Sequence, residues 1–348
     1  MKVTRIGLDL AKQVFQVHGV DEKGRKVLSR QLKRGQVEGF FRGLEGCLVG
    51  MEACAGAHHW ARVLGGLGHE VRLMAPQHVK PYVKGSKNDA NDAEGICEAV
   101  GRPNMRFVAM KTVEQQRLQS LHRVRRTLVR NRTAAVNEIR GLLGEYGIVV
   151  RVGVAKLRGR LPELLEEADN GLPMSFRPVL AGLKEDLEYL DRRIGEMDAA
   201  MVRAAQEDER ARALMKLRGV GPVTATALVA GLGDGKQFRR GRQASAWVGI
   251  VPGQHSSGGK ERLLGISKRG DEYLRTLLIH GARSVVNSCK GKTDRLSRWV
   301  QEVCARRNKN VAAVALANKT MRMAWALLSR GEQYDPDYEL NRRAAQAA

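Results

Sequence analysis

The sequence predicts an α/β domain at the N-terminus, then a long helical arm, then a mainly helical second domain. Within residues 1–108, short runs of β-forming residues alternate with segments of helical spacing. Residues 112–145 and 178–207 repeat leucines at helical spacing over unusually long stretches. From residue 211 onward the apolar residues again follow helical spacing, with glycine-rich breaks between the segments. A chain of 348 residues is long enough for two such cores.

The first domain is predicted as a mixed sheet. A buried strand within residues 3–10 precedes strands over 14–20 and 26–32, which join at a turn over 21–24. A helix over 36–44, a strand over 47–52, a helix over 57–67 and a strand over 70–74 follow. Three hairpin strands followed by alternating helices and strands are the order of an RNase H-like fold. The alternative is a doubly wound nucleotide-binding sheet, but no GxGxxG or GxxxxGK[ST] follows any predicted strand.

Four acidic residues are candidates for a metal site. Asp9 interrupts an apolar strand, and burying a carboxylate costs several kcal/mol unless a charge or hydrogen bonds compensate it. Glu52 ends a second apolar run, and Asp89 and Asp92 lie three residues apart at the start of a helix over 89–100, where they share a face. Oxygen ligands without a Cys/His cluster favour Mg²⁺ over zinc. The alternatives are an ordinary strand-end carboxylate for Asp9 and helix capping for Asp89 and Asp92.

The arm is predicted to span residues 109–210. Amphipathic helices over 112–145 and 178–207 are joined through a Gly/Val-rich link over 147–159 and a helix over 162–170. Helices of this length most simply pair with each other or across a dimer, so we interpret this segment as a coiled-coil linker and oligomerisation arm.

The second domain is predicted over residues 211–330, with a polar tail over 331–348. Residues 214–228 have a helix-hairpin-helix pattern, in which Gly219 and Gly221 would let backbone N–H groups approach a phosphate; an ordinary helical turn explains the pattern equally well. An exposed Gly/Ser loop over 249–260 has basic residues on both sides, which favours anion binding. Helices over 273–288, 296–306 and 311–328 close the domain.

The composition favours a polyanionic partner. The chain has 60 Lys and Arg against 37 Asp and Glu, a net charge of +23, and the excess is spread along its whole length. An anionic membrane is the weaker alternative, because no segment reaches the ~18 apolar residues of a spanning helix and no signal peptide is recognisable. Five scattered cysteines without CxxC spacing indicate a reducing cytosol and no disulfide framework. At 5% aromatic residues, stacking on single-stranded bases is not expected as the main binding mode.

Several basic residues in loops and on the arm are predicted to contact nucleic-acid phosphates, although charge runs are usually solvated faces. They are Lys12, Lys84, Lys87, Arg123, Arg126, Arg130, Lys260, Lys268 and Arg269.

Four motifs, in this order, resemble those of the IS110/IS1111 transposases, a family that includes the Piv-type DNA invertases. They are Gly-Leu-Asp-Leu-Ala-Lys at 7–12, Glu-Ala-Cys-Ala-Gly at 52–56, Lys-Asn-Asp-Ala-Asn-Asp-Ala at 87–93, and Gly-Ile-Val-Pro at 249–252 followed by Ser-Ser-Gly-Gly-Lys at 256–260 and Ser-Lys-Arg-Gly at 267–270. The similarity spans residues 3–330, and Gln-His-Ser-Ser-Gly-Gly-Lys favours the IS1111 branch.

The resemblance implies a RuvC-like first domain with a DEDD tetrad of Asp9, Glu52, Asp89 and Asp92, which holds Mg²⁺, with Mn²⁺ as a substitute. It implies a nucleophilic serine in the Gly/Ser loop, carried onto Ser257, with Ser256 as the nearest competitor. It further implies donor and target DNA as substrates, a noncoding bridge RNA as guide, and a dimer or tetramer in the bacterial cytoplasm, associated with the nucleoid.

Two other functions are compatible with the residues. One is a RuvC-like, Mg²⁺-dependent nuclease or Holliday-junction resolvase that uses water and forms no covalent serine intermediate. The other is a basic nucleic-acid-binding protein whose acids are structural. No homeodomain, zinc finger or basic zipper is recognisable, and base pairing with an RNA would fit that gap.

Overall fold

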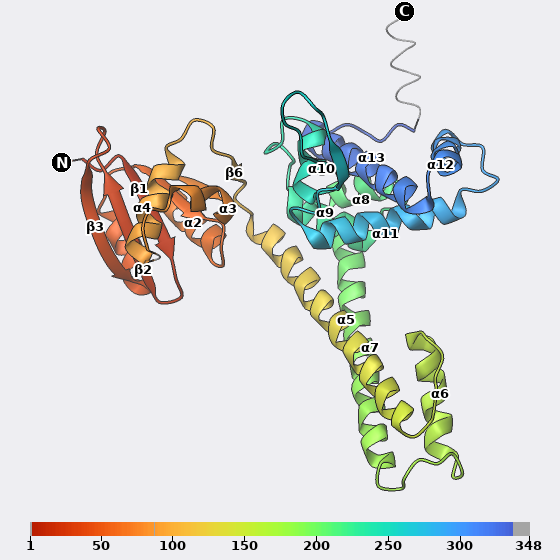
Figure 1. The fold of residues 1–348 in the computed structure, drawn as a ribbon. Helices are drawn as coiled ribbons and strands as arrows, with labels where there is room; N and C mark the ends of the chain where they lie inside the picture. The colour runs from red at the N-terminus through yellow and green to blue at the C-terminus, as the bar shows by residue number, and fades with distance from the viewer. Residues whose placement is uncertain (1, 87, 337–348) are drawn as a thin grey trace, which may run out of the picture. The chain divides into compact units, whose positions relative to one another are not determined.

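The computed structural model describes residues 2–86 and 88–336 (Figure 1). The chain folds into two compact units, Met1–Val113 and Glu114–Ala348, and each is described by itself. No described helix is both long enough and apolar enough to cross a membrane. The predicted Lys87 contact and the part of the predicted tail beyond residue 336 lie outside the described residues.

The first unit is built on a six-stranded mixed sheet with the order β3-β2-β1-β4-β5-β6. The strands are β1 (Arg5–Leu10), β2 (Val14–Val20), β3 (Lys26–Lys33), β4 (Leu48–Glu52), β5 (Glu70–Met74) and β6 (Phe107–Val108). β2 is antiparallel to β1 and β3, whereas β1, β4 and β5 are parallel. The predicted mixed sheet is confirmed; β6 is a short edge strand that the sequence did not predict.

Helices cover both faces of this sheet. On one face α1 (Val37–Arg42), which follows a 3-10 turn at Arg34–Gln36, and α2 (Ala57–Gly66) share a core with the apolar side chains of β1, β2 and β4. On the other face lie α3 (Pro76–Val79), a second 3-10 turn (Lys80–Tyr82) and α4 (Asp89–Val100), which crosses β1, β2 and β4 (Figure 1). Gly7 lies under α4, because a Cβ there would come within 2.0 Å of the Ala93 carbonyl oxygen.

The second unit is almost entirely helical. Its elements are α5 (Val113–Glu145), α6 (Val154–Glu166), α7 (Arg177–Glu207), α8 (Glu209–Met215), α9 (Pro222–Leu232), α10 (Gly241–Val248), the hairpin β7 (Pro252–Gln254) and β8 (Leu263–Ile266), α11 (Glu272–Ser288), α12 (Arg295–Arg306) and α13 (Lys309–Arg330). Eight of the eleven residues of α9 are buried, which makes it the centre of the core shared by α8 to α13. A helix that is buried on almost all sides is stable only when other helices surround it.

The long helices α5 and α7 interact within one chain. Arg132 of α5 pairs with Asp191 of α7 at 3.1 Å, and Arg125 pairs with Asp198 further along. Beyond these ion pairs, buried leucines and valines of α5, α6 and α7 form a separate small core. Of the two arrangements that the sequence allowed, the structure shows helices that interact with each other; the domain boundaries at 109 and 210 and the oligomeric state stay predictions.

The helix predicted over 162–170 is wrong in its bounds. α6 spans Val154–Glu166, so it takes up half of the predicted Gly/Val-rich link and includes Pro162. The helix begins after Gly153, whose φ of 123° interrupts the preceding chain. Leu157, Leu161 and Leu164 are fully buried at helical spacing, and this packing outweighs the local cost of a proline inside a helix.

His122, next to the predicted phosphate contact Arg123, is a core residue, and the Gly219 turn packs against a neighbouring helix. His122 is 4% exposed, and its ring nitrogens hydrogen-bond to Tyr273 Oη and Thr226 Oγ1, both at 3.0 Å. Burial, followed by the charge of Arg125, lowers the pKa of His122 to about 4, so the ring is neutral near pH 7. The Gly219 turn packs against α11, because a Cβ there would lie 2.7 Å from the Gly281 carbonyl oxygen. Gly221, at the N-terminus of α9, is exposed, so the helical turn and the phosphate-binding hairpin both stay predictions.

We expect Gly7→Ala to destabilise the first unit by about 3 kcal/mol, because the added methyl group collides with the backbone of α4 and forces that helix off the sheet. The measurement is the free energy of unfolding by urea. Gly65→Ala in α2 is the matched control, because no atom lies within 4 Å of its added Cβ and alanine favours the helix. Equal effects of the two substitutions would contradict the close packing of α4.

Candidate functional site

Asp9 and Glu52 lie side by side at the ends of the two central strands. β1 and β4 are parallel and in register up to the pair Leu8 and Met51, and each acid is the next residue along its strand. Residues in register on parallel neighbours direct their side chains to the same face of the sheet. Both residues are half-buried, so the two carboxylates share one partly shielded location.

That face is the one that α4 covers. Gly7 and Gly50 each approach α4 closely, since a Cβ on Gly50 would lie 2.6 Å from Cβ of Val100. Side chains alternate along a strand, so Asp9 and Glu52, two residues further on, project to the same face as these glycines. Both acids influence the pKa of the nearby Cys54 thiol. Burial raises this pKa most, the negative charge of Glu52 raises it next, and that of Asp9 raises it more weakly.

Asp89 and Asp92 occupy the first turn of α4. The cap of this helix is Asn88, whose side-chain oxygen accepts a hydrogen bond from the Asn91 N–H at 2.8 Å. The alternative prediction of a capping role for Asp89 and Asp92 is therefore wrong, because Asn88 fills that role. Acids in a first helical turn are favoured by the helix dipole, and neither carboxylate is used to begin the helix. Asp92 is half-buried and Asp89 is exposed.

The four acids suit a hard divalent cation in their chemistry. All are carboxylates, the ligands that Mg²⁺ prefers, and two of them already lie on the α4-covered face of the sheet. Within residues 2–86 and 88–336, however, no three His, Cys, Asp or Glu side chains lie close enough together to hold a metal ion. The structure thus brings Asp9 and Glu52 together, whereas the joining of Asp89 and Asp92 to them stays a prediction.

The predicted Gly/Ser loop of the second unit is the end of a β-hairpin. β7 and β8 are antiparallel, and an isolated bridge joins Ser257 to Lys260 beyond them. Gly258 and Gly259 have φ of 56° and 76°, and the Lys260 N–H donates to the Ser257 carbonyl oxygen at 3.0 Å. Two successive positive φ values define a type I′ turn, which glycine adopts without strain. The prediction of an exposed segment is confirmed.

The hairpin distinguishes the two candidate serines. The Ser256 Oγ accepts hydrogen bonds from the Gln254 side chain at 3.0 Å and from the Arg262 N–H at 3.1 Å, so it stabilises the hairpin. Among the described hydrogen bonds none involves Ser257 Oγ, and this hydroxyl lies exposed where the turn begins. Lys260 lies opposite Ser257 across the turn.

The base of the hairpin is held tightly. The Ser267 N–H donates to the Val251 carbonyl oxygen at 2.8 Å, and the Asn318 side chain of α13 donates to the Ile250 carbonyl oxygen at 3.0 Å. Gly249, with a φ of 78°, permits the chain crossing, because a Cβ there would lie 2.0 Å from the Arg269 carbonyl oxygen. The turn that carries Ser257 is therefore presented by a fixed base.

The predicted phosphate contacts that the structure describes are all exposed: Lys12, Lys84, Arg123, Arg126, Arg130, Lys260, Lys268 and Arg269. Arg126 is partly engaged, since it pairs with Glu272 at 3.3 Å. Lys268 has a φ of 53°, the only positive value at a non-glycine residue in the described chain. The sequence did not predict a further group of arginines, Arg240 and Arg242 at the start of α10 and Arg322 on α13. The basic segment over 236–242 is a signal for the first two, and Arg322 has none.

Carboxylates on one face of a mixed sheet, a serine–glycine hairpin and a strongly basic chain are together features of enzymes that act on nucleic-acid phosphates. Comparison with known proteins agrees with this class. Residues 6–148 match the family model of DEDD transposases of the IS110 type, and residues 211–298 match the transposase IS116/IS110/IS902 family.

Whole-length relatives carry the same designation. The chain is 56% identical to a probable family 20 transposase of Pseudomonas aeruginosa, over 97% of this chain and 100% of the relative. It is 48% identical to the transposase for insertion sequence element IS1111A of Coxiella burnetii, over 94% and 90% of the two chains. It is 42% identical to the transposase for IS1328 of Yersinia enterocolitica, over 94% and 98%. The chain belongs to the IS110/IS1111 family of transposases, enzymes that cleave and rejoin DNA.

Asp9→Asn and Glu52→Gln should each weaken Mn²⁺ binding by about tenfold or more, because each removes one negative oxygen donor from the shared face. Titration of the full chain followed by the electron paramagnetic resonance of free Mn²⁺ measures this effect. Glu45→Gln, an exposed acid paired only with Lys2 among the described ion pairs, is the control that should leave binding unchanged. Unaltered affinity in both site variants would count against a metal at these strands.

Proposed function

We propose that this transposase exchanges DNA strands through a covalent phosphoserine intermediate formed at Ser257. The observation that carries the proposal is the difference between the two neighbouring serines. Ser256 Oγ is committed to two hydrogen bonds within the hairpin, whereas Ser257 Oγ is exposed beside the Gly258–Gly259 turn. Both serines are exposed, but among the described hydrogen bonds only the Ser256 hydroxyl is used within the hairpin, which leaves the lone pairs of Ser257 Oγ available for attack on a phosphate.

In the proposed first step, Ser257 Oγ attacks the scissile phosphorus and forms a new P–O bond. The bond from phosphorus to the leaving deoxyribose oxygen breaks, the serine proton passes to a base, and the leaving oxygen acquires a proton. In the second step a hydroxyl of the other DNA strand attacks the phosphoserine and releases the serine. The number of phosphodiester bonds is unchanged, so the exchange needs no external energy source.

The chain's own groups support this chemistry in two ways. Lys260, across the turn from Ser257, would neutralise part of the charge on the phosphate, and the N–H groups of the glycine turn would bind its oxygens. The tetrad of Asp9, Glu52, Asp89 and Asp92 would hold Mg²⁺ or Mn²⁺. When bound, that ion supplies further charge neutralisation and lowers the pKa of an attacking hydroxyl.

The remaining proposals concern partners. No familiar DNA-reading motif is present, so we propose that pairing with a noncoding bridge RNA selects donor and target DNA. Two duplexes must be cut and rejoined together, which favours a homo-oligomer, a dimer or a tetramer, acting on nucleoid DNA in the cytoplasm. A RuvC-like resolvase, in which water replaces the serine, is the competing mechanism.

Ser257→Ala should reduce strand exchange by about 10³-fold or more while leaving DNA binding intact, because only the attacking atom is lost. The measurement is recombination between two plasmids that carry the element's ends and a target, in cells that also supply the flanking noncoding sequence. Ser256→Ala is the matched control, and it should retain most of the activity because it loses only hairpin hydrogen bonds. If Ser257→Ala recombined normally, or Ser256→Ala were the inactive variant, the assignment would be wrong.

A further inference from the structure

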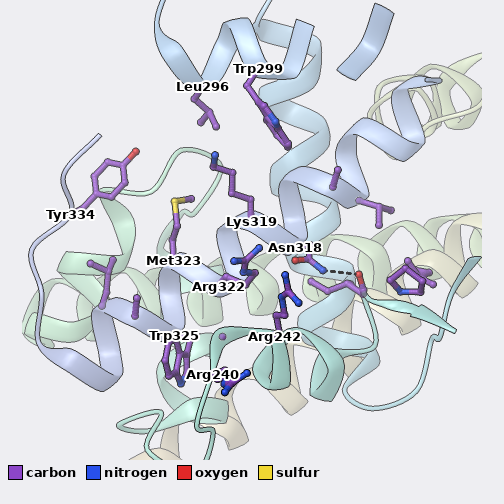
Figure 2. A pocket seen from close by; sticks show the side chains of 18 of the residues that line it. Arg240, Arg242, Leu296, Trp299, Asn318, Lys319, Arg322, Met323, Trp325 and Tyr334 are labelled. Atoms are coloured by element: carbon purple, nitrogen blue, oxygen red, sulfur yellow. Dashed lines mark hydrogen bonds between the residues drawn. The ribbon is translucent and has the colours of Figure 1, made fainter. Parts of the chain in front are cut away.

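The second unit contains a large groove that the proposed chemistry does not use. It has a volume of about 1570 Å³ and is lined by α10, the β7–β8 hairpin, α12, α13 and the segment over 332–336 (Figure 2). Pro252, Leu264 and Ile266 bring the base of the Ser257 hairpin into its wall. A ligand in this groove would therefore lie against the same hairpin that carries the serine.

The groove is strongly cationic. Seven of its lining residues are lysine or arginine, and two, Glu332 and Asp335, are acids. In the described part of the chain, Arg240, Arg242 and Arg322 have no ion-pair partner. Exposed arginines without partners are available to a polyanion, since no existing ion pair has to be broken.

A single glycine brings these arginines together. Gly241 begins α10 directly against α13, where a Cβ would lie 3.2 Å from Cβ of Arg322 and 3.1 Å from the Trp325 ring. Arg240 and Arg242 flank this glycine in the chain, and Figure 2 shows Arg242 close to Arg322 within the pocket. The close approach of the two helices thus concentrates three positive charges from separate parts of the sequence.

The groove also offers an apolar surface suited to a nucleobase. Trp299 is half-buried, and the Lys319 ammonium lies 5.0 Å from the centre of its ring. Leu296 and Met323 line the same side of the pocket, as Figure 2 shows. Aromatic residues are scarce in this chain, yet two of its four tryptophans, Trp299 and Trp325, line this one groove.

We propose that this groove binds a single-stranded segment of nucleic acid, with its phosphates on Arg240, Arg242 and Arg322 and a base stacked on Trp299. A duplex presents phosphates outside and hides the faces of its bases, so it would leave the apolar side unfilled. An unpaired strand satisfies both features, as in other proteins that combine a basic groove with aromatic platforms. This inference rests on the proposed strand exchange, in which unpaired strands arise.

The test is fluorescence anisotropy of labelled oligonucleotides bound to the full chain with Ser257→Ala, so that cleavage plays no part. Oligo(dT) and oligo(U) of about 12 nucleotides are compared with a duplex of the same length. The groove variant, Arg240→Ala/Arg242→Ala/Arg322→Ala, should bind single strands more weakly and lower the slope of log affinity against log salt by about 2. Tighter binding of oligo(dT) would identify the strand in the groove as DNA, and tighter binding of oligo(U) would identify it as RNA.

A matched control removes the same charge elsewhere. Arg151→Ala/Lys156→Ala/Arg203→Ala changes three exposed residues of α7 and the α5–α6 region outside the groove and should leave the single-strand affinity nearly unchanged. Equal losses in the two triple variants, or tighter binding of the duplex than of either single strand, would overturn the proposal. Thermal unfolding of both variants verifies that each is folded, and Arg322→Lys, which keeps the charge, should retain most of the affinity.

Trp299 provides an independent readout. Stacking of a base should quench its fluorescence on titration with oligo(dT) or oligo(U), and Trp299→Phe should abolish most of that quenching while affinity is largely kept. Trp299→Ala should weaken binding by about tenfold. Quenching that persists in Trp299→Phe would contradict the stacking of a base on Trp299. Because no step requires Ser257, loss of the serine mechanism would leave these results intact, and failure of the groove would leave the serine mechanism intact.

Discussion

The packing of α4 on two glycines governs the geometry of the first unit. Gly7 and Gly50 are in register on neighbouring parallel strands, and both lack the side chain that would hold the helix away from the sheet. The helix therefore lies directly on the backbone of β1 and β4. Because side chains alternate between the two faces along a strand, Asp9 and Glu52, two residues after these glycines, also lie on the face that α4 covers. Shielding from water strengthens their interaction with any cation that enters.

In the second unit, close-packed glycines hold the base of the β7–β8 hairpin. An exposed two-stranded hairpin is marginally stable by itself, so its base must be held by the helical core. Gly249 and Gly270 allow the crossing of the two ends, and α13 contributes a side-chain hydrogen bond to the entering strand. The result is a turn that is open to solvent on a base that is fixed. This combination suits a residue that must reach a large substrate in one orientation.

Local signals in the sequence predicted most of the fold. The β5 bounds agree with the structure to the residue, and α4 ends at the predicted Val100, because Pro76 follows the strand and Gly101 follows the helix. The predicted bounds of α6 were wrong because Gly159 and Pro162 are poor helix formers. The helix is stabilised by the packing of Leu157, Leu161 and Leu164 against α5 and α7, which the local sequence does not show. The burial of His122 was equally inaccessible, because Thr226 and Tyr273 are about a hundred or more residues away in the sequence.

The candidate site, like the fold, could be predicted only in part from the sequence. Short motifs predict Asp9, Glu52, Asp89, Asp92 and Ser257 as site residues, and the structure adds that Asp9 and Glu52 lie on one face of the sheet. The choice between Ser256 and Ser257 depends on which hydroxyl the hairpin uses for its own hydrogen bonds, and this is visible only in three dimensions. The groove arginines come from two distant segments that Gly241 brings into contact, and no pattern along the chain joins them.

Mass spectrometry of a trapped protein–DNA adduct determines whether one reaction needs both the acids of the first unit and the serine of the second. After incubation with DNA, guide RNA and Mg²⁺, denaturation and proteolysis should yield a nucleotide attached to the peptide that contains Ser257. The adduct should disappear when Mg²⁺ is removed or when Asp9 is replaced by Asn. A nucleotide on any other residue, or an undiminished adduct in the Asp9→Asn protein, would contradict the account.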